Sequence, residues 1–416
     1  MLLRKSSQAE RPSLLIAAIS ARSLVQSARR AGFAPLAVDF FADADTQEAA
    51  FACRKLGGGM KRGFRQESLL RALAALATHA PSPVLGLVYG AGFEDRASLL
   101  TTIGKRWPLL GNDAGTIAKL KAPEVFFAAL DRLGIAHALT VTKRPAKGHA
   151  WLAKKTGGAG GSHIVSGRLA KEAANFYYQQ RVEGRAVSAL FVGNGVDARV
   201  LGFSEQWTAP TPKSLWRYGG AVRPADLTAT VVRKMMSDVM GVTRAFQIRG
   251  LASADFMVSE EGVLLLEINP RPGATLDIFD CGARPLLCLH VEAVLHGKLR
   301  SKPLKFEGAM ASAIVYAEHG GRTPSGAVWP HWTADRPKSS EWIDKNGPIC
   351  TVWARGKTKT QAKRLIEERI CNILAGFQKI SRGEDGEQKR RNRRSEQDQV
   401  AKRQRQGGAA RQSAHR

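Results

Sequence analysis

The stretch that decides the fold is ASADFMVSEEGVLLLEINPRPGATLD, which runs from Ala252 to Asp277. Two apolar runs flank Glu260-Glu261-Gly262, and this spacing predicts an antiparallel hairpin with a three-residue loop whose glycine is left-handed. In that register Asp255 lies directly opposite Glu267, with Cβ atoms about 4.5 to 5.5 Å apart. The strand period of two places Asn269 on the same face as Glu267.

The other face of the predicted hairpin is entirely apolar, as a buried face should be: it carries Ala254, Phe256 and Val258 against Leu264, Leu266 and Ile268. On the polar face the two opposed carboxylates repel one another and require a cation. Carboxylate and amide oxygens suit Mg²⁺, with Mn²⁺ as an alternative. We therefore expect Asp255, Glu267 and Asn269 to be metal ligands. The competing interpretation is an exposed hairpin with unrelated acids.

Arg271 follows this predicted metal strand directly after Pro270. Its rigid guanidinium could hold a phosphate or a developing acyl phosphate through two hydrogen bonds. An arginine at a strand end is usually only a surface charge. Beside a metal site it becomes a candidate catalytic residue.

A second motif is AWLAKKTGGAGGSHI, from Ala150 to Ile164, in which a strand with Lys154 and Lys155 precedes the glycine run of residues 157 to 161. Glycines let the backbone approach phosphate oxygens closely, and lysine supplies a point charge. Taken alone, the run would also fit a linker. It is not a Walker A loop, because the pattern G-x-x-x-x-G-K-[ST] is absent.

A third segment, YYQQRVEGRAVSALFV, runs from Tyr177 to Val192 as a short linker into a strand. Such a linker between two halves of a cleft could present the main chain of Val182 to the edge of an adenine. Gln180 and Glu183 would then be its side-chain partners. The same residues equally fit a polar turn before a strand.

The N-terminal part predicts a β-α-β unit, with strands at Ser13 to Ile19 and Pro35 to Phe41 around a helix at Arg22 to Ala31. Val84 to Tyr89 predicts a further parallel strand. No G-x-G-x-x-G motif occurs here, so dinucleotide binding is not expected.

The composition bounds the function without choosing it. The 416 residues are 44% hydrophobic, with no apolar run long enough to cross a bilayer, and the five cysteines contain no C-x-x-C pair. We expect a cytoplasmic protein with no membrane segment. The net charge of +27 favours anionic ligands, from nucleotides to nucleic acid. After Ser381 the chain is almost free of apolar residues and is predicted to be a disordered tail, for which contact with nucleic acid stays open.

The order of strand, lysine and glycine loop, then linker and strand, then Asp...Glu-x-Asn is similar to the ATP-grasp superfamily, which includes biotin carboxylase, D-alanine ligase and the glycinamide ribonucleotide synthetases. The resemblance covers most of Ser13 to Leu374. It implies an α/β chain with the ATP-grasp fold and three parts: a Rossmann-like preATP-grasp domain (1–110), a small lobe with the glycine loop (111–185) and a metal-binding lobe (186–300). The residue pattern itself predicts two further parts, a small α/β cap (301–380) and a disordered basic tail (381–416).

The resemblance also implies site residues and cofactors. Lys154 would contact the α-phosphate of ATP, with Mg²⁺ on the hairpin, and Lys121 would be an earlier nucleotide-binding lysine. This chain departs from the family pattern at two positions. Gln180 stands where the family usually has an acidic residue in the linker, and Ala186 stands where an acidic residue often follows Gly-Arg. The β- and γ-phosphates would be covered by Gly157, Gly158, Gly160 and Gly161.

Four further stretches resemble a narrower group, the predicted ATP-dependent carboligases related to biotin carboxylase in one-carbon metabolism: VDFFADADT (38–46), VYGAGFEDR (88–96), GFSEQW (202–207) and RYGGAVRP (217–224). The clustered polar and aromatic residues in the last two would form an acceptor pocket or part of the core: Gln206, Trp207, Arg217, Tyr218, Gly219 and Gly220.

These features predict an ATP-dependent ligase that activates a carboxylate as an acyl phosphate and joins it to an amine. The expected product is an amino acid such as glutamate joined to a cofactor precursor. Whether the protein forms a homodimer is left open. One alternative is a carboxylase that activates bicarbonate. A different class is a nucleic-acid-binding protein that uses the ATP-grasp domain as a scaffold.

Overall fold

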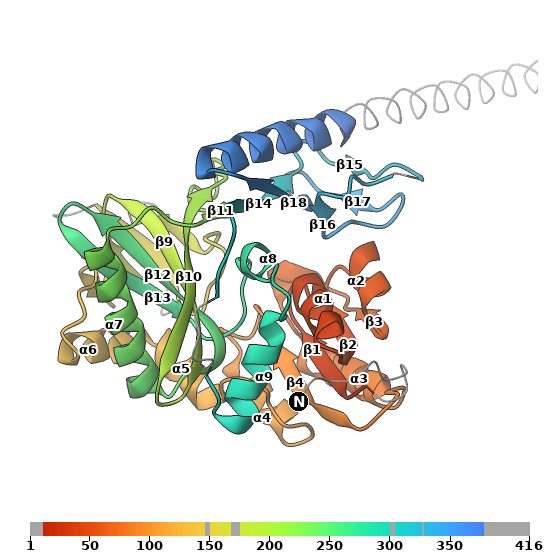
Figure 1. Ribbon diagram of the computed structural model, residues 1–416, viewed down its shortest axis with the longest axis horizontal. Helices are drawn as coiled ribbons and strands as arrows, with labels where there is room; N and C mark the ends of the chain where they lie inside the picture. Colours follow the sequence, from red (N-terminus) through yellow and green to blue (C-terminus); the bar gives the residue numbers. More distant parts are fainter. Residues whose placement is uncertain (1–10, 146–149, 168–174, 300–303, 327, 378–416) are drawn as a thin grey trace, which may run out of the picture.

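The computed structural model describes residues 11–145, 150–167, 175–299, 304–326 and 328–377 (Figure 1). The predicted basic tail therefore lies outside the described residues. The N-terminal part is a parallel sheet in the order β3-β2-β1-β4. Its strands are β1 (Ser13–Ala17), β2 (Ala34–Asp39), β3 (Ala52–Lys55) and β4 (Val84–Tyr89), and its helices are α1 (Arg22–Arg30), α2 (Ala44–Ala49), the short η2 (Met60–Arg62), α3 (Gln66–Ala77) and α4 (Ala97–Gly104).

The side chains of β1 alternate between two cores. Leu14 and Ile16 pack with the apolar face of α1. Leu15 and Ala17 pack with α3 and α4 on the opposite side of the sheet. A parallel sheet covered on both faces leaves the carboxyl ends of its strands as the natural edge for a ligand site.

A small lobe follows. α5 (Ala114–Lys121) and α6 (Pro123–Arg132) lead into it, and α6 begins with a proline in its first turn, where the missing N–H costs nothing. The lobe is an antiparallel sheet in the order β5-β8-β6-β7, and the glycine run connects β6 to β7. These strands are β5 (Thr140–Val141), β6 (Trp151–Lys155), β7 (Ile164–Ser166) and β8 (Phe176–Gln180).

The largest sheet has the order β13-β12-β9-β10-β11-β14-β18-β16, and its neighbours pair antiparallel. β14 and β18 come from the predicted C-terminal cap, which thus continues the sheet that carries the predicted metal ligands. The strands are β9 (Arg185–Asn194), β10 (Ala198–Thr208), β11 (Tyr218–Arg223), β12 (Arg249–Ser259), β13 (Gly262–Asn269), β14 (Ala309–Tyr316), β16 (Thr333–Ala334) and β18 (Pro348–Gly356), with β15 (Gly321–Arg322) and β17 (Trp342–Ile343) as a separate pair.

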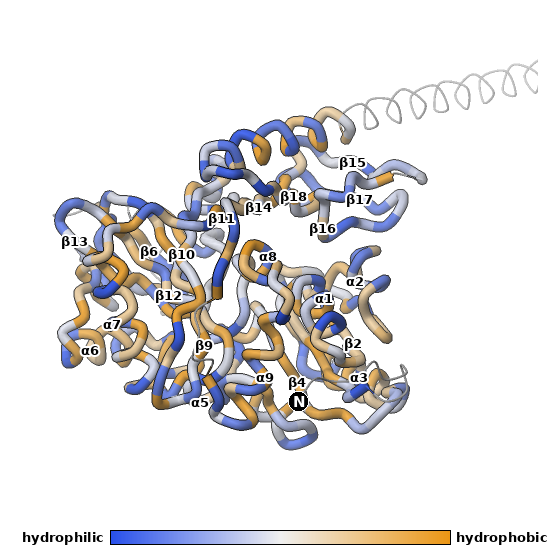
Figure 2. Tube along the Cα trace, in the orientation of Figure 1, coloured by the Kyte–Doolittle hydropathy of each residue, from blue (hydrophilic) through white to orange (hydrophobic). Residues whose placement is uncertain are grey.

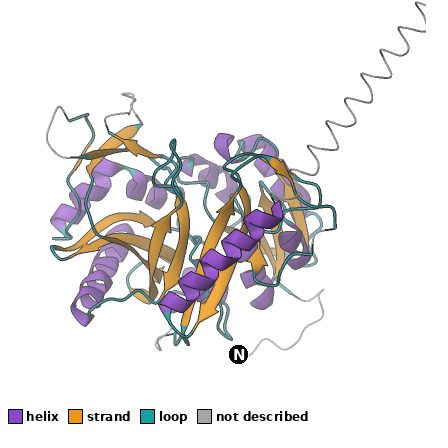
Figure 3. Ribbon diagram, turned by 90° about the horizontal axis from the view of Figure 1, so that it is seen from above, coloured by secondary structure: helices purple, strands orange, loops and turns teal. Residues whose placement is uncertain are grey.

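Helices cover this sheet at several places. α7 (Ala229–Phe246) buries Met235 and Val239 against β9 and β12. α8 (Leu276–Phe279) and α9 (Leu286–His296) share one core with α1 and β1, so the N-terminal sheet and the large sheet are packed together. Residues 359–377 form a helix over β14 and β18, which Figure 3 shows in front of the strands. Figure 2 shows the apolar residues concentrated on the enclosed strands.

The hairpin of β12 and β13 keeps the central prediction and corrects two others. Asp255 lies opposite Glu267 as predicted, but Ser259 pairs with Gly262, so the loop has two residues instead of three. The shorter loop shifts the ladder by one residue, and a bulge at position 266 restores the register at Asp255. The predicted apolar face is therefore wrong at positions 264 and 266, because Val263 and Leu265 enter the core in their place.

Candidate functional site

Two carboxylates and an amide converge on one face of the hairpin. The Ser188 hydroxyl donates to Asp255 Oδ1 at 2.6 Å. Asn269 Nδ2 donates to Asp255 Oδ2 at 2.9 Å and to Glu267 Oε1 at 3.2 Å. A donor thus lies where a cation would join both acids, and an amide turned over would offer its oxygen instead. This hard, oxygen-bearing set fits Mg²⁺.

The pKa values of the two acids move apart. Burial, and then the charge of Glu267, raise the pKa of Asp255 to about 6. Burial also acts to raise the pKa of Glu267, but the charges of Lys121, His163 and Lys154 lower it to about 2. The pair therefore shares its negative charge unequally, and a divalent cation would relieve the remaining repulsion. No group of three or more His, Cys, Asp or Glu suited to a metal occurs in the described ranges.

Lys121 reaches this pair from the last turn of α5. Its Nζ donates to Asn269 Oδ1 at 3.2 Å and lies 3.8 Å from Glu267 Oε2. Its side chain is only 8% exposed. The sequence predicts Lys121 as a nucleotide-binding residue, and the fold places it beside the predicted metal ligands.

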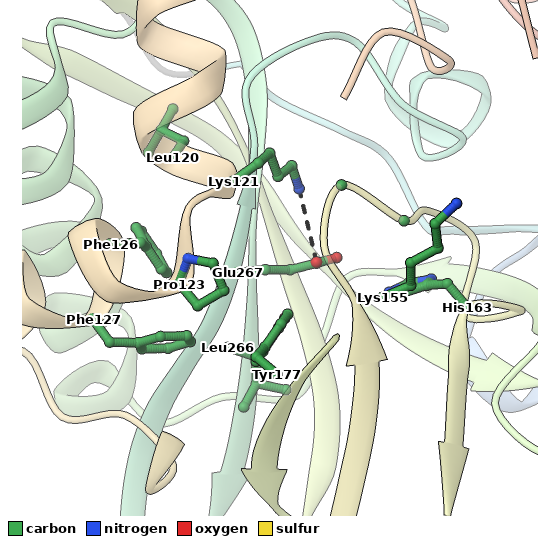
Figure 4. Close-up of a pocket in the computed structure, with 12 residues that line it drawn as sticks. Leu120, Lys121, Pro123, Phe126, Phe127, Lys155, His163, Tyr177, Leu266 and Glu267 are labelled. Atoms are coloured by element: carbon green, nitrogen blue, oxygen red, sulfur yellow. Dashed lines mark ion pairs between the residues drawn. The ribbon is translucent and has the colours of Figure 1, made fainter. Parts of the chain in front are cut away.

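A cleft lies between the small lobe and β13 (Figure 4). In Figure 4 the side chains of Lys121 and Glu267 point toward one another. Those of Phe127, Tyr177 and Leu266 lie together on the opposite side of the Glu267 carboxylate from Lys121. The bulge explains why two consecutive residues, Leu266 and Glu267, both face the cleft. The lining consists of Leu120, Lys121, Pro123, Phe126, Phe127, Lys155, Gly157, Gly158, His163, Tyr177, Leu266 and Glu267.

The two lysines of β6 face different surroundings, as alternation along a strand requires. Lys155 lines the cleft. Lys154 is buried, and its Nζ donates to Gln179 Oε1 at 2.7 Å. Burial lowers the pKa of Lys154, while the charges of Glu267 and Asp255 partly offset that effect. Lys154 therefore lies close to the predicted metal ligands.

The glycine run is held between two walls of the molecule. A Cβ on Gly157 would lie 2.7 Å from the Cα of Asp95, and one on Gly161 would lie 1.7 Å from the Trp216 carbonyl oxygen. Both glycines have positive φ, at 70° and 74°. The Gly160 carbonyl accepts the Tyr218 N–H at 3.0 Å. Only glycine permits these approaches, so the run bridges the N-terminal domain and β11.

Comparison with known proteins agrees with this geometry. Residues 120–275 match a family model described as an ATP-grasp domain. The fold is similar to the biotin carboxylase domain of a Hydrogenobacter thermophilus 2-oxoglutarate carboxylase, solved with MgADP and bicarbonate, at 13% identity and TM-score 0.67. The similarity covers 84% of this chain and 88% of that one. The protein has an ATP-grasp fold.

Two other proteins are similar to this chain. An L-amino acid ligase from Bacillus licheniformis matches at 13% identity and TM-score 0.66, over 86% of this chain and 96% of that one. An uncharacterized protein of Methanocaldococcus jannaschii is 24% identical over 190 residues, which are 46% of this chain and 45% of that protein. The match thus spans less than half of that curated relative.

Arg271 of the ATP-grasp domain faces the N-terminal domain. Its Nε donates to Glu94 Oε1 at 2.7 Å, and the arginine is 9% exposed. The other Glu94 oxygen accepts the N–H groups of Gly92 and Phe93. Burial acts to raise the pKa of Glu94, but the charges of Arg271 and Lys121 lower it. The loop after β4 thus fixes the orientation of Arg271.

The predicted adenine-binding linker lies beside the cleft, not in its lining. The Gln180 N–H donates to the Leu139 carbonyl at 2.8 Å. The Glu183 side chain is 87% exposed and pairs with Arg181. Neither residue, nor Val182, belongs to the lining, whereas Tyr177 of the same strand does.

Sequence reasoning missed Phe127, Tyr177, Lys155, His163 and Leu266 as lining residues. Their apolar members look like core positions, because a helix or strand period does not distinguish a core from a cleft wall. His163 and Lys155 stand inside the glycine motif, which was the one signal that pointed to them.

The predicted acceptor residues divide between two sides of β10 and β11. Gln206 Nε2 lies 3.4 Å from Asp255 Oδ1, beside the predicted metal ligands. Trp207 packs on Gly219 and Gly220 on the other side. Arg217 stacks on the Tyr316 ring, 3.6 Å from its centroid.

Proposed function

We propose that this protein is an ATP-dependent ligase that activates a carboxylate as an acyl phosphate and joins it to an amine. One observation carries the proposal. A single hairpin brings the oxygens of Asp255, Glu267 and Asn269 together, and Glu267 of this group lines the cleft that the glycine run and Lys155 enclose.

The residues that line the cleft indicate where the base and the phosphates of the nucleotide would lie. The apolar and aromatic side chains of Phe127, Tyr177 and Leu266 suit a base. The glycine run and the β6 lysines suit the phosphates. Asp255, Glu267 and Asn269 would hold Mg²⁺, whose charge offsets that of the β- and γ-phosphates.

The chemistry follows from this placement. A substrate carboxylate oxygen attacks the γ-phosphorus, and the bond from phosphorus to the ADP oxygen breaks. The amine nitrogen then attacks the carbonyl carbon, inorganic phosphate leaves, and the nitrogen loses a proton. Positioning and electrostatics supply the catalysis, with Lys154 and Arg271 offsetting negative charge. The glycine run shields the acyl phosphate from water.

A bicarbonate-activating carboxylase is the second candidate. The biotin carboxylase domain and the amino acid ligase fit this chain equally well, with TM-scores of 0.67 and 0.66. The narrower assignment to one-carbon metabolism, with an amino acid such as glutamate as a substrate, rests on the four motif stretches between residues 38 and 224. Homodimer formation and cytoplasmic location stay predictions.

The test is a screen for ADP release from MgATP, with candidate acids and amines supplied in pairs and bicarbonate in a separate arm. The ligase proposal expects ADP release that requires both members of a pair. Release stimulated by bicarbonate without an amine would favour the carboxylase. Failure of MgATP to bind the purified protein would contradict both.

A further inference from the structure

Tyr218, the first residue of β11, has a buried hydroxyl group. Its backbone is fully engaged: the N–H donates to the Gly160 carbonyl at 3.0 Å, and the carbonyl accepts the Tyr316 hydroxyl at 2.9 Å. The Tyr218 hydroxyl itself makes no hydrogen bond to any of the residues that the structure describes. A buried hydroxyl without a partner destabilises the fold, so its retention needs a reason.

The surroundings of this hydroxyl locate it in the molecule. The Tyr218 ring packs against the core shared by α8 and α1. Burial, and then the charges of Asp277, Tyr316 and Asp255, raise the pKa of Tyr218, so the group stays protonated. Thr208 of β10 pairs with Tyr218, and the strand period of two puts Thr208 on the same face as Gln206, whose Nε2 lies 3.4 Å from Asp255 Oδ1. The Tyr218 ring therefore lies on the sheet face that carries the predicted metal ligand Asp255.

The neighbouring charges indicate which ligand group suits this hydroxyl. Asp277 is already paired with Arg22, which also pairs with Asp335. Asp255 accepts from Ser188 and Asn269. Both carboxylates have their own partners, so what the site still offers is a protonated donor. A donor is complementary to an acceptor oxygen on the ligand.

We propose that the Tyr218 hydroxyl donates a hydrogen bond to the substrate carboxylate that is to be phosphorylated, and so orients it toward the γ-phosphate. This inference rests on the proposed ligase function. The same residue holds the glycine run through its N–H. Tyr218 thus has two roles. Its N–H holds the glycine run over the phosphates, and its hydroxyl positions the attacking carboxylate oxygen.

The experiment uses the reverse half-reaction, because it needs no knowledge of the natural acid. The full-length protein is given MgADP with acetyl phosphate or carbamoyl phosphate as acyl phosphate probes, and ATP is measured with luciferase. Tyr218→Phe should raise the KM for the probe or lower kcat/KM by about tenfold or more, as expected for a lost hydrogen bond to a charged group. The affinity for MgADP should not change, because phenylalanine keeps both backbone bonds.

Tyr316→Phe is the matched control. It removes a neighbouring hydroxyl whose partner lies within the chain, so Tm should fall while ATP formation stays near the wild-type rate. Tyr218→Phe removes an unpartnered hydroxyl, so its Tm should equal or exceed that of the wild type.

The outcomes separate the two levels of the proposal. Wild-type protein that forms no ATP with either probe overturns the ligase function. Wild-type activity with an unchanged Tyr218→Phe variant overturns the role of Tyr218 alone. A Tyr218→Phe variant that loses Tm and MgADP affinity together would show a structural role and would also overturn it.

Discussion

Leu265 and Leu266 are identical in chemistry, adjacent on β13, and opposite in surroundings. Leu265 is fully buried in the core beneath α7. Leu266 lines the cleft beside Glu267. Ordinary alternation along the strand gives Leu265 and Leu266 opposite faces, and the bulge then keeps Glu267 on the side of Leu266 instead of returning it to the side of Leu265.

The first prediction compares alanine at these two positions. Leu265→Ala should lower the free energy of unfolding by about 2 to 4 kcal/mol, as a cavity in a closed core does. Leu266→Ala should cost less stability but should weaken MgATP binding. Urea denaturation and calorimetric titration measure the two effects. The reverse order would contradict the placement of Leu265 in the core and of Leu266 in the cleft.

The second prediction concerns Glu267, the predicted metal ligand. Glu267→Gln keeps the size of the side chain but removes its charge, so Mg²⁺-dependent ATP turnover should fall by on the order of 100-fold or more. Glu260→Gln, on the exposed hairpin loop, is the control and should turn over ATP normally. Undiminished turnover in Glu267→Gln would refute the metal assignment.

At the scale of elements, the glycine run gives the third prediction. Gly160 and Gly161 both have positive φ, so alanine at either position costs about 1 kcal/mol of backbone strain. Only at Gly161 would the added Cβ meet another backbone atom, the Trp216 carbonyl oxygen. Gly161→Ala should therefore lose most ATP turnover by preventing this contact, and Gly160→Ala should retain much more. Equal losses would show that the contact with Trp216 is not needed.

The sequence was sufficient where the pattern is local. The strand Val84–Tyr89 has the predicted bounds, and Asp255 opposes Glu267 as predicted. The loop length and the bulge were not predictable, because packing of β13 against the rest of the molecule, not the hairpin alone, determines the register. The pairing of β11 with β14 joins segments about 90 residues apart. No local pattern encodes such a pairing.

The site was predictable only in part for a related reason. The acids, lysines and glycines belong to recognisable motifs, and the fold brings Lys121, Lys154 and the hairpin acids close together. Phe127 and Tyr177 come from separate elements of the small lobe. Their convergence depends on how α6 and β8 pack, which single-sequence periodicity does not contain.

At the scale of the whole molecule, His290 of α9 links the two large parts. The Leu251 N–H donates to its Nδ1 at 2.8 Å, and its Nε2 contacts the Leu110 carbonyl at 2.8 Å. Since Nδ1 accepts, Nε2 carries the proton and the ring is neutral. Burial lowers the pKa of His290 to about 4. The linked segments are β12 and the chain that follows the N-terminal sheet.

The fourth prediction follows from that pKa. In the unfolded chain His290 titrates near pH 6.5, so between about pH 6.5 and 4 the unfolded state binds the extra proton. Stability should be complete above this window and should decline by about 3 kcal/mol as the pH falls through it. His290→Asn should flatten this part of the profile in urea denaturation. Exposed His79→Asn is the control, and a slope unchanged in His290→Asn would contradict the prediction.

The eight-stranded sheet extends from β13, in the hairpin that carries the predicted metal ligands, to the cap strands β18 and β16. The cap strands and this hairpin are therefore parts of one hydrogen-bonded sheet. We expect the large sheet to move as one rigid body, so that nucleotide can enter the cleft only when the small lobe moves away from it. The close contacts of the glycine run with Asp95 and Trp216 would then have to break before the product leaves, and their opening would limit the rate of product release.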